Sequence, residues 1–270
     1  MVRVLLFFLV SSLCFSANLD LNLKNLLGDK VYEQNSGKLR TLFSNEAMFL
    51  DENSNPNYDK ITNLLRTNSI LSLNYSSPAY MDLTFKSTSS TILFLKVITQ
   101  SLNNLGYNYF LTKNFSTQNS QISWLVTINT QFILNPGNLY KELKQNNVYI
   151  KGIHKTGTFS YTYDIDMSRA ILKTLPYESD TTVELSKPLE PYFLNINGKK
   201  NIEIMANPAD NWISLVKIYD RNLKLISQIK SDIKEKSLNI EFPDDAFYIL
   251  IDDAFSLENI KRGLKIYIKS

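Results

Sequence analysis

The sequence is poor in cysteine and histidine, with one of each among its 270 residues. Cys14, the only thiol, lies in an N-terminal segment that has the pattern of a removable export signal. The mature chain would then have no disulfides, thiol nucleophiles, redox motifs or cysteine-metal sites, and its stability would come from a packed core. His154 alone cannot build a zinc site; carboxylates would have to complete the coordination.

The chain also lacks a strong charge of either sign and a long hydrophobic run. It has 29 Lys and Arg residues against 26 Asp and Glu residues, interspersed along the sequence. This pattern shows no basic stripe of the kind that binds nucleic acid, so we expect no nucleic-acid partner. No apolar run approaches the length of about 20 residues that spans a bilayer, and we expect no transmembrane segment after signal cleavage.

Residues 1–16 have the order of a secretory signal peptide. Arg3 supplies a positive start, the apolar run Val4–Val10 follows, and cleavage after Ser16 places small residues at the recognition positions. Leu13 before Cys14 disfavours a lipid anchor, which requires a small residue there. The Asn-, Lys-, Ile- and Tyr-rich composition is typical of low-GC bacteria. We therefore expect an exported bacterial protein of the periplasm, with the extracellular space as the alternative.

Residues 17–57 predict an irregular N-terminal arm. Leu19, Leu21 and Leu23 alternate with polar residues, and turn-forming residues follow at Gly28 and around Gly37. We expect one hairpin here, between residues 30–32 and 39–43, packed on the domain that follows.

Residues 58–175 predict an α+β domain with two or three helices packed on a sheet. Apolar spacing indicates helices over residues 59–66 and 90–105, and Asn135 followed by Pro136 opens a third. Alternating or β-branched segments predict strands over residues 70–75, 80–85, 107–111, 122–128, 148–153 and 159–167.

Residues 176–191 contain three prolines and read as a linker with a short strand embedded in it. From residue 192 to residue 270 every convincing segment is a strand, seven in all, separated by turns. This spacing predicts a C-terminal antiparallel β-sandwich. Asn197-Gly198 is the strongest hairpin signal in the chain.

Three groups of side chains are candidates for a site. Asp164 and Asp166 fall on the polar face of one expected strand, close enough to share a cation or to act as an acid–base pair. Asp252 and Asp253 end another expected strand, where loop carboxylates could bind calcium, although adjacent aspartates in turns are commonly solvated turn formers.

Trp212 opens a strand at the rim of the expected sandwich. Its ring could stack on a glycan there, but a core position is favoured. His154 falls in an expected turn between strands, and a surface turn position is favoured for it.

No catalytic motif emerges from these residues, and Gly-x-Ser-x-Gly does not occur. We expect a non-enzymatic binding or scaffolding component of a cell-envelope assembly, without a cofactor, whose partner is an envelope protein or peptidoglycan. The alternative is a carboxylate- or metal-dependent hydrolase acting on envelope glycan.

Overall fold

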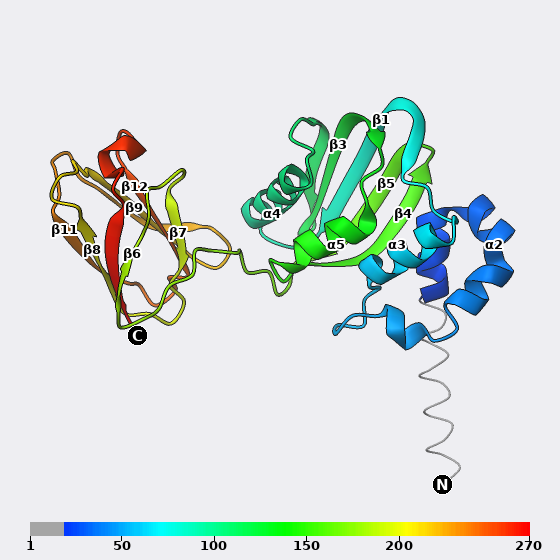
Figure 1. Ribbon diagram of the computed structural model, residues 1–270, viewed down its shortest axis with the longest axis horizontal. Coiled ribbons are helices and arrows are strands. Elements are labelled where there is room, and N and C mark those ends of the chain that lie inside the picture. The colour runs from blue at the N-terminus through cyan, green and yellow to red at the C-terminus, as the bar shows by residue number, and fades with distance from the viewer. Residues whose placement is uncertain (1–18) are drawn as a thin grey trace, which may run out of the picture. The chain divides into compact units, whose positions relative to one another are not determined.

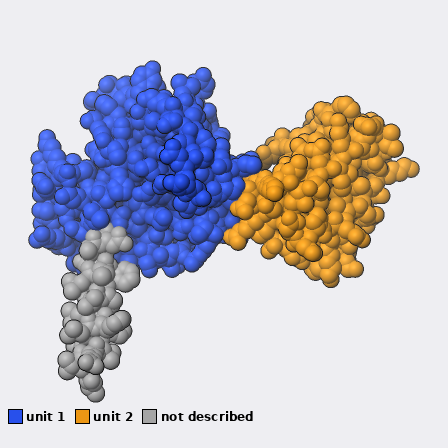
Figure 2. All heavy atoms as spheres, turned by 180° about the vertical axis from the view of Figure 1, so that it is seen from behind, with its two compact units in different colours: residues 1–172 blue, residues 173–270 orange. Residues whose placement is uncertain are grey.

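The computed structural model describes residues 19–270, so the expected signal peptide lies outside the described residues. The chain divides into two compact units, residues 1–172 and residues 173–270 (Figure 2). Within the described part, no helix is both long enough and apolar enough to cross a bilayer.

The N-terminal arm is helical, and the hairpin expected within it is wrong. Residues 19–27 are helical, Gly28 with φ 78° separates them from the next helix, and α2 spans Asp29–Leu42. The side chain of Asn35 donates to the carbonyl of Val31, and that of Thr41 donates to the carbonyl of Gly37. These bonds accommodate turn-favouring residues inside a helix, where packing of the apolar face decides the outcome.

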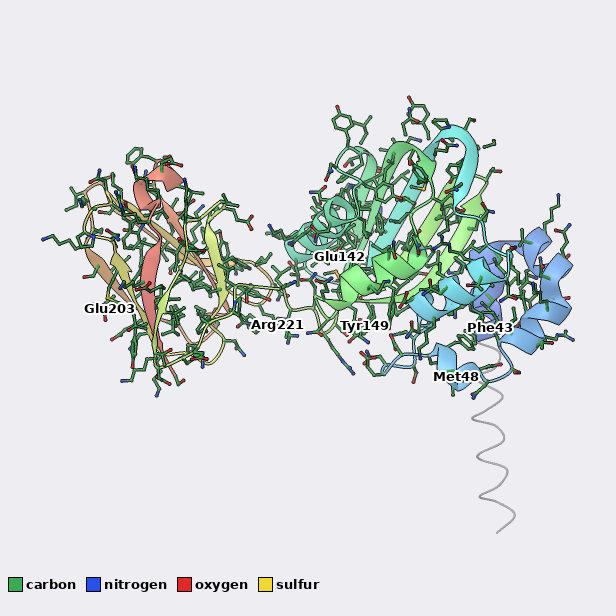
Figure 3. All side chains as sticks on the ribbon, viewed as in Figure 1. Phe43, Met48, Glu142, Tyr149, Glu203 and Arg221 are labelled. Carbon is green, nitrogen blue, oxygen red and sulfur yellow. The ribbon has the colours of Figure 1, made fainter. Side chains whose placement is uncertain are left out.

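The loop that follows α2 is tied to the rest of unit 1. Phe43, labelled in Figure 3, is buried. Its ring centroid is 4.6 Å from that of Phe49, which ends the short helix η1 (Glu46–Phe49). Beyond η1, the Tyr149 hydroxyl donates to the Glu52 carboxylate over 3.1 Å, and the Lys144 ammonium contacts the same carboxylate at 2.9 Å. The arm is therefore part of the domain.

A five-stranded mixed sheet forms the centre of unit 1. Its order is β2-β3-β1-β5-β4, in which β1 and β5 are parallel and the other neighbours are antiparallel. The strands are β1 (Asn74–Ser87), β2 (Leu111–Gln118), β3 (Gln121–Phe132), β4 (Tyr149–Gly157) and β5 (Ser160–Asp166).

The three expected helices of this unit are confirmed as α3 (Tyr58–Thr67), α4 (Thr91–Asn104) and α5 (Pro136–Lys144). The Asn135 side chain caps α5 by accepting from the backbone N–H groups of Gly137 and Asn138. Helices α4 and α5 cover one face of the sheet (Figure 1). Their apolar side chains and those of the strands, including Phe85 and Trp124, are buried between the layers.

Two of the expected strands are misplaced. Residues 70–73 and 107–110 are not strand, and β1 and β2 begin later, at Asn74 and Leu111. A β-bulge between Asn74 and Ala79 lets β1 continue through Pro78, which has no N–H to pair. The break expected at that proline therefore does not occur.

Unit 2 is the expected antiparallel β-sandwich. One sheet has the order β10-β9-β12-β7 and the other β11-β8-β13-β6. The strands are β6 (Thr182–Glu184), β7 (Tyr192–Asn195), β8 (Asn201–Ala206), β9 (Ser214–Tyr219), β10 (Leu225–Lys230), β11 (Ser237–Glu241), β12 (Tyr248–Asp253) and β13 (Leu264–Lys269), with the short helix η2 (Leu257–Ile260) before β13. Segment 176–191 contains β6, which pairs with β13, and so it packs within this unit.

The Asn197-Gly198 turn forms, but it does not close a hairpin. The Lys199 N–H donates to the Ile196 carbonyl over 3.0 Å, and Gly198 has φ 72°. However, β7 pairs with β12, whereas β8 pairs with β11 and β13. The turn therefore carries the chain from one sheet of the sandwich to the other.

Candidate functional site

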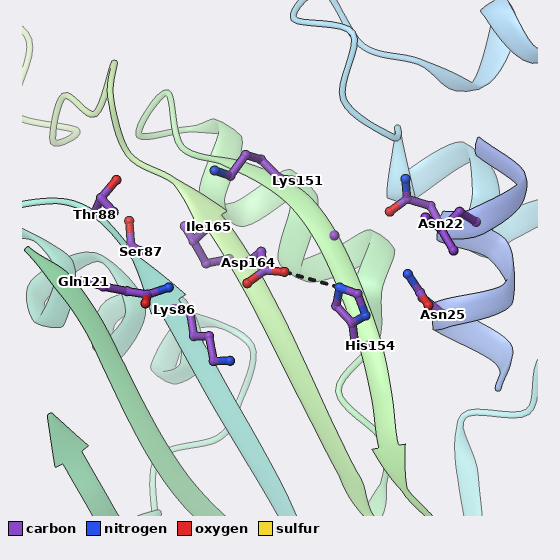
Figure 4. A pocket seen from close by; sticks show the side chains of 12 residues that line it. Asn22, Asn25, Lys86, Ser87, Thr88, Gln121, Lys151, His154, Asp164 and Ile165 are labelled. Carbon is purple, nitrogen blue, oxygen red and sulfur yellow. Dashed lines mark ion pairs between the residues drawn. The ribbon is translucent and has the colours of Figure 1, made fainter. Parts of the chain in front are cut away.

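A polar pocket of about 310 Å³ opens in unit 1 at the ends of the parallel strands β1 and β5. Neighbouring β4, the start of β3 and the helical segment 19–27 complete it (Figure 4). The lining consists of Leu21, Asn22, Asn25, Lys86, Ser87, Thr88, Gln121, Lys151, Gly152, His154, Asp164 and Ile165.

Strand register brings the centre of this pocket together. Lys86 of β1 is the partner of Asp164 on β5, and Asp164 is the partner of Gly152 on β4. Directly paired residues share a face of a sheet, so these three positions form one row across it. A Cβ at Gly152 would lie 3.5–3.7 Å from polar atoms of His154, Asn22 and Asp164. Polar groups thus converge around a position that has no side chain.

His154 lies on β4, not in the turn expected for it, and is paired with Asp164. Its Nε2 is 3.3 Å from Oδ2 of Asp164, and the two side chains are 43% and 38% exposed. The contact is an ion pair when the imidazole is protonated, and a carboxylate at this distance orients the ring in either state. The pair thus places an imidazole and a carboxylate side by side in the pocket.

Asp166 does not join Asp164 in the pocket. Its Oδ1 accepts from the Ser168 N–H over 2.9 Å, which closes the turn after β5. Among the described residues, Asp164 is the only carboxylate that lines the pocket, and no Phe, Tyr or Trp ring lines it. The two aspartates share a strand face as expected, but only one of them contributes to the site.

Two lysines supply the excess charge of the pocket. Within residues 19–270, the side-chain ammonium groups of Lys86 and Lys151 form no ion pair and no hydrogen bond. Lys151 is the extra residue at a register shift between Ile150 and Gly152. Bulges of this kind redirect side chains and are frequent beside functional sites. In Figure 4, Lys151 extends from β4 toward β5.

Ser87 is a buried polar group without a partner. It is 6% exposed, lines the pocket, and its Oγ has no hydrogen-bond partner in the described part of the chain. Buried hydroxyls are normally satisfied by a protein group or by ordered water. A ligand or water in the pocket could satisfy that of Ser87.

The helical segment 19–27 contributes two amides. Asn22 and Asn25 are three residues apart and therefore lie on the same side of the helix. Buried leucines at positions 19, 23, 26 and 27 form the adjacent, apolar side of the same helix. Asn22 also accepts a 3.3 Å hydrogen bond from the hydroxyl of Tyr58, whose pKa is raised by burial. The leucine spacing is a helical signal that sequence analysis could have used; instead, the alternation of Leu19, Leu21 and Leu23 was interpreted as part of an irregular arm.

The candidate site residues of unit 2, Trp212, Asp252 and Asp253, lie close together, and their contacts stabilise the sandwich. Trp212 is fully buried in the sandwich core, and its Nε1 donates to the Asp252 carbonyl over 2.9 Å. Trp212 therefore occupies the core position that was favoured for it, and its buried ring is not available for stacking on a glycan.

Asp253 is 4% exposed and accepts four hydrogen bonds at 2.8–2.9 Å. The donors are the backbone N–H groups of Ile213, Phe255 and Ser256 and the side-chain amide of Asn259. Burial raises the pKa of this carboxyl, but the hydrogen bonds outweigh burial and hold the pKa below its usual value. The neighbouring Asp252 carboxylate accepts from the Asp253 N–H over 2.8 Å.

A calcium ion at Asp253 would have to displace several of these donors, so the geometry favours a structural role for this carboxylate. Within the described residues, no three His, Cys, Asp or Glu side chains lie close enough together to hold a metal ion.

Comparison with known proteins identifies no family. No protein-family model matches the chain, and no curated protein matches it. A crystal structure of accessory secretory proteins 1, 2 and 3 from Streptococcus pneumoniae is similar over 36% of this chain and 83% of that chain, at 17% identity and a TM-score of 0.20.

The secreted serine protease VesC from Vibrio cholerae is similar over 60% of this chain and 39% of that chain, at 9% identity and a TM-score of 0.21. Both likenesses are too distant to support an argument about function.

Proposed function

We propose that this protein is a non-enzymatic binding component of the bacterial cell envelope, exported to the periplasm, and that the pocket of unit 1 is its recognition site. The observation that carries the proposal is the convergence of Lys86, Lys151 and Asn25 on a pocket in which they have few partners of their own. The signal-peptide pattern of residues 1–16 supports the location.

The groups around the pocket suit recognition better than glycan hydrolysis. Glycosidases use two carboxyl groups, about 5 Å apart in retaining enzymes and about 6.5–9.5 Å apart in inverting ones. The pocket holds Asp164 alone, because Asp166 is engaged with the turn after β5. A serine nucleophile would need a hydrogen bond to a base, and the Ser87 hydroxyl has no partner among the described residues.

The partner class that we propose is peptidoglycan or an envelope protein. Amides, hydroxyls and ammonium groups line the pocket, and these donors match the hydroxyl, amide and carboxylate groups that such partners expose. Unit 2 would then act as a second module of a scaffold.

Co-sedimentation with purified peptidoglycan tests the proposal, together with crosslinking of the exported full-length protein in intact cells. We expect the protein to pellet with peptidoglycan or to crosslink to one envelope protein, and we expect Lys86→Gln combined with Lys151→Gln to reduce that recovery. If the wild-type protein neither pellets nor crosslinks above background, the binding function is wrong.

The His154–Asp164 pair favours one alternative, a hydrolase acting on envelope glycan, because an imidazole held by a carboxylate can act as a general base. Release of soluble fragments from peptidoglycan would reveal this activity. For this alternative we expect Asp164→Asn to abolish release and Asp166→Asn to leave it unchanged. No release by the wild-type protein would eliminate it.

A further inference from the structure

We infer that the pocket of unit 1 takes a compact, hydroxylated anion whose carboxylate or phosphate group binds Lys86 and Lys151. The inference rests on the proposed binding function and names the ligand class of the same site. Its carrying observation is the placement of two unpaired ammonium groups around one small polar cavity.

The topology of the sheet brings the two lysines to the pocket from different strands. In the order β1-β5-β4, Lys86 belongs to β1 and Lys151 to β4, and β5 with Asp164 lies between them. The register shift at Lys151 frees its side chain from the regular alternation of β4. Two lysines that flank one strand can contact the same anion from opposite sides.

Asp164 offsets only one of these two positive charges. Its carboxylate is engaged by His154, and the lining holds two lysines against this one acidic residue. A carboxylate beside two ammonium groups instead restricts where the ligand's own charge can lie. The Asp164 carboxylate can also accept a hydrogen bond from a ligand hydroxyl. An anion without hydroxyl groups could not make this contact.

The remaining lining points to a ligand with several hydroxyl or amide groups. Asn25 and Gln121 offer amides, and Ser87 offers a buried hydroxyl without a partner in the described residues. The volume of about 310 Å³ is at the lower end of the range for ligand pockets, about 300–1,000 Å³. A single acidic sugar or a similarly small hydroxy acid matches this size and chemistry.

Titration of the exported full-length protein with three probes tests the inference. The probes are D-glucuronate, its neutral analogue D-glucose, and inorganic phosphate, with binding followed by protein NMR at low ionic strength. We expect D-glucuronate to bind at least about tenfold more tightly than D-glucose, because a charge-assisted hydrogen bond contributes about 1.5–3 kcal/mol and 1.4 kcal/mol is a factor of ten.

The phosphate arm separates the two sources of negative charge. If phosphate competes with D-glucuronate at comparable concentration, the lysines recognise any compact anion. If the inhibition constant of phosphate is more than about tenfold higher than the Kd of D-glucuronate, the site recognises the hydroxyl groups of the ligand as well as its carboxylate. Either result supports the site, and failure of both anionic probes to bind overturns it.

Three matched variants place the binding at the lysines. We expect Lys86→Gln and Lys151→Gln each to weaken D-glucuronate about tenfold, with the unfolding midpoint unchanged. Lys155→Gln is the control, because Lys155 is an exposed lysine of β4 that does not line the pocket. If Lys155→Gln weakens binding as much as the other two, only net charge matters and the inference is wrong.

The proposed function and this inference can fail separately. Peptidoglycan binding by a protein that binds neither D-glucuronate nor phosphate would overturn the ligand class and leave the envelope function standing. Tight, lysine-dependent binding of D-glucuronate by a protein with no envelope partner would support the ligand site and overturn the proposed envelope function.

Discussion

The two units of this protein use their buried and charged side chains differently. In unit 2, the Asp253 carboxylate accepts four hydrogen bonds, and the buried carboxylate of Asp210 is paired with Arg262 at 2.6 Å. In unit 1, the pocket collects two unpaired lysines and the unpartnered hydroxyl of Ser87. Polar groups that are satisfied within the fold stabilise it, and those left unsatisfied at a cavity are available for a ligand.

The largest effect is expected at a glycine of unit 2. Gly263 has φ 82°, and a Cβ placed there would lie 1.8 Å from the Leu185 carbonyl oxygen. We expect Gly263→Ala to lower the free energy of unfolding of unit 2 by about 4 kcal/mol or more, because both the clash and the left-handed backbone oppose the methyl group. Hydrogen exchange resolved by residue would localise the loss to this unit.

Gly198→Ala is the matched control for this prediction. Gly198 has φ 72° with no heavy atom within 4 Å of the added Cβ, so only the backbone cost of about 1–2 kcal/mol applies. Equal losses at the two glycines would show that the close approach at Gly263 is relieved by a backbone shift.

The next largest effect is expected at Asp253. We expect Asp253→Asn to cost about 2–3 kcal/mol in urea unfolding, because an amide accepts fewer and weaker hydrogen bonds than the carboxylate and places a donor against backbone N–H groups. Asp252→Asn is the control, because the Asp252 carboxylate accepts only from the Asp253 N–H within the described residues, and it should cost less than about 1 kcal/mol, on the order of a single neutral hydrogen bond. Similar losses for both variants would contradict the structural role of Asp253.

Acid unfolding gives a second measurement on Asp253. Its pKa is lowered in the folded state, so its stabilisation is fully present above the unfolded pKa of about 4 and is lost as pH falls through the lower folded pKa. We expect the stability of the wild-type protein to decrease in this acidic window and that of Asp253→Asn to decrease less. Parallel pH profiles of the two proteins would refute this assignment.

A smaller effect is expected at the cap of α5, where unit 1 has a satisfied polar group of its own. Asn135→Ala removes the side chain that accepts from Gly137 and Asn138, and we expect a loss of about 1 kcal/mol. Asn138→Ala, at an exposed position of the same helix, should change stability by less than about 0.5 kcal/mol. Equal effects would show that the cap contributes nothing.

The smallest effect is expected at Ser87. The Ser87 hydroxyl has no hydrogen-bond partner in the described residues, so Ser87→Ala should leave the free energy of unfolding within about 0.5 kcal/mol of the wild type. In unit 2, Ser256→Ala should cost about 1 kcal/mol, because the Ser256 hydroxyl accepts from the Glu258 N–H. Thermal unfolding of both variants would measure this difference in stability between the two units. A clear loss of stability in Ser87→Ala would contradict the assignment of Ser87 as an unpartnered group.

The fold class was predictable from the local pattern of apolar and polar residues, whereas the pairing of strands into sheets was not. Apolar period and capping residues identified α3, α4 and α5, and alternation identified the strands of the sandwich. The Asn197-Gly198 turn was predicted, but its strands pair in different sheets, because a turn sets only the local direction of the chain. The helical arm was missed because turn-favouring residues outweighed a weak apolar period.

Sequence analysis identified one residue of the pocket, and strand pairing brings the other residues to it. Asp164 was identified from its place on a polar strand face, but its partner His154 is ten residues earlier on β4, where the antiparallel register pairs Gly152 with Asp164 and His154 with Thr162. Lys86, Lys151 and Asn22 have no local signature, since exposed lysines and asparagines occur throughout the chain.

By itself, the sequence determined the α+β then β-sandwich order and indicated an export signal, because these depend on residue type and on spacing along the chain. Only the tertiary structure decided that Asp253 is saturated by hydrogen bonds whereas Lys86 and Lys151 are not. The physical reason is that a hydrogen-bond partner or an opposing charge comes from wherever the sheet register places it, and register depends on contacts between residues far apart in the chain.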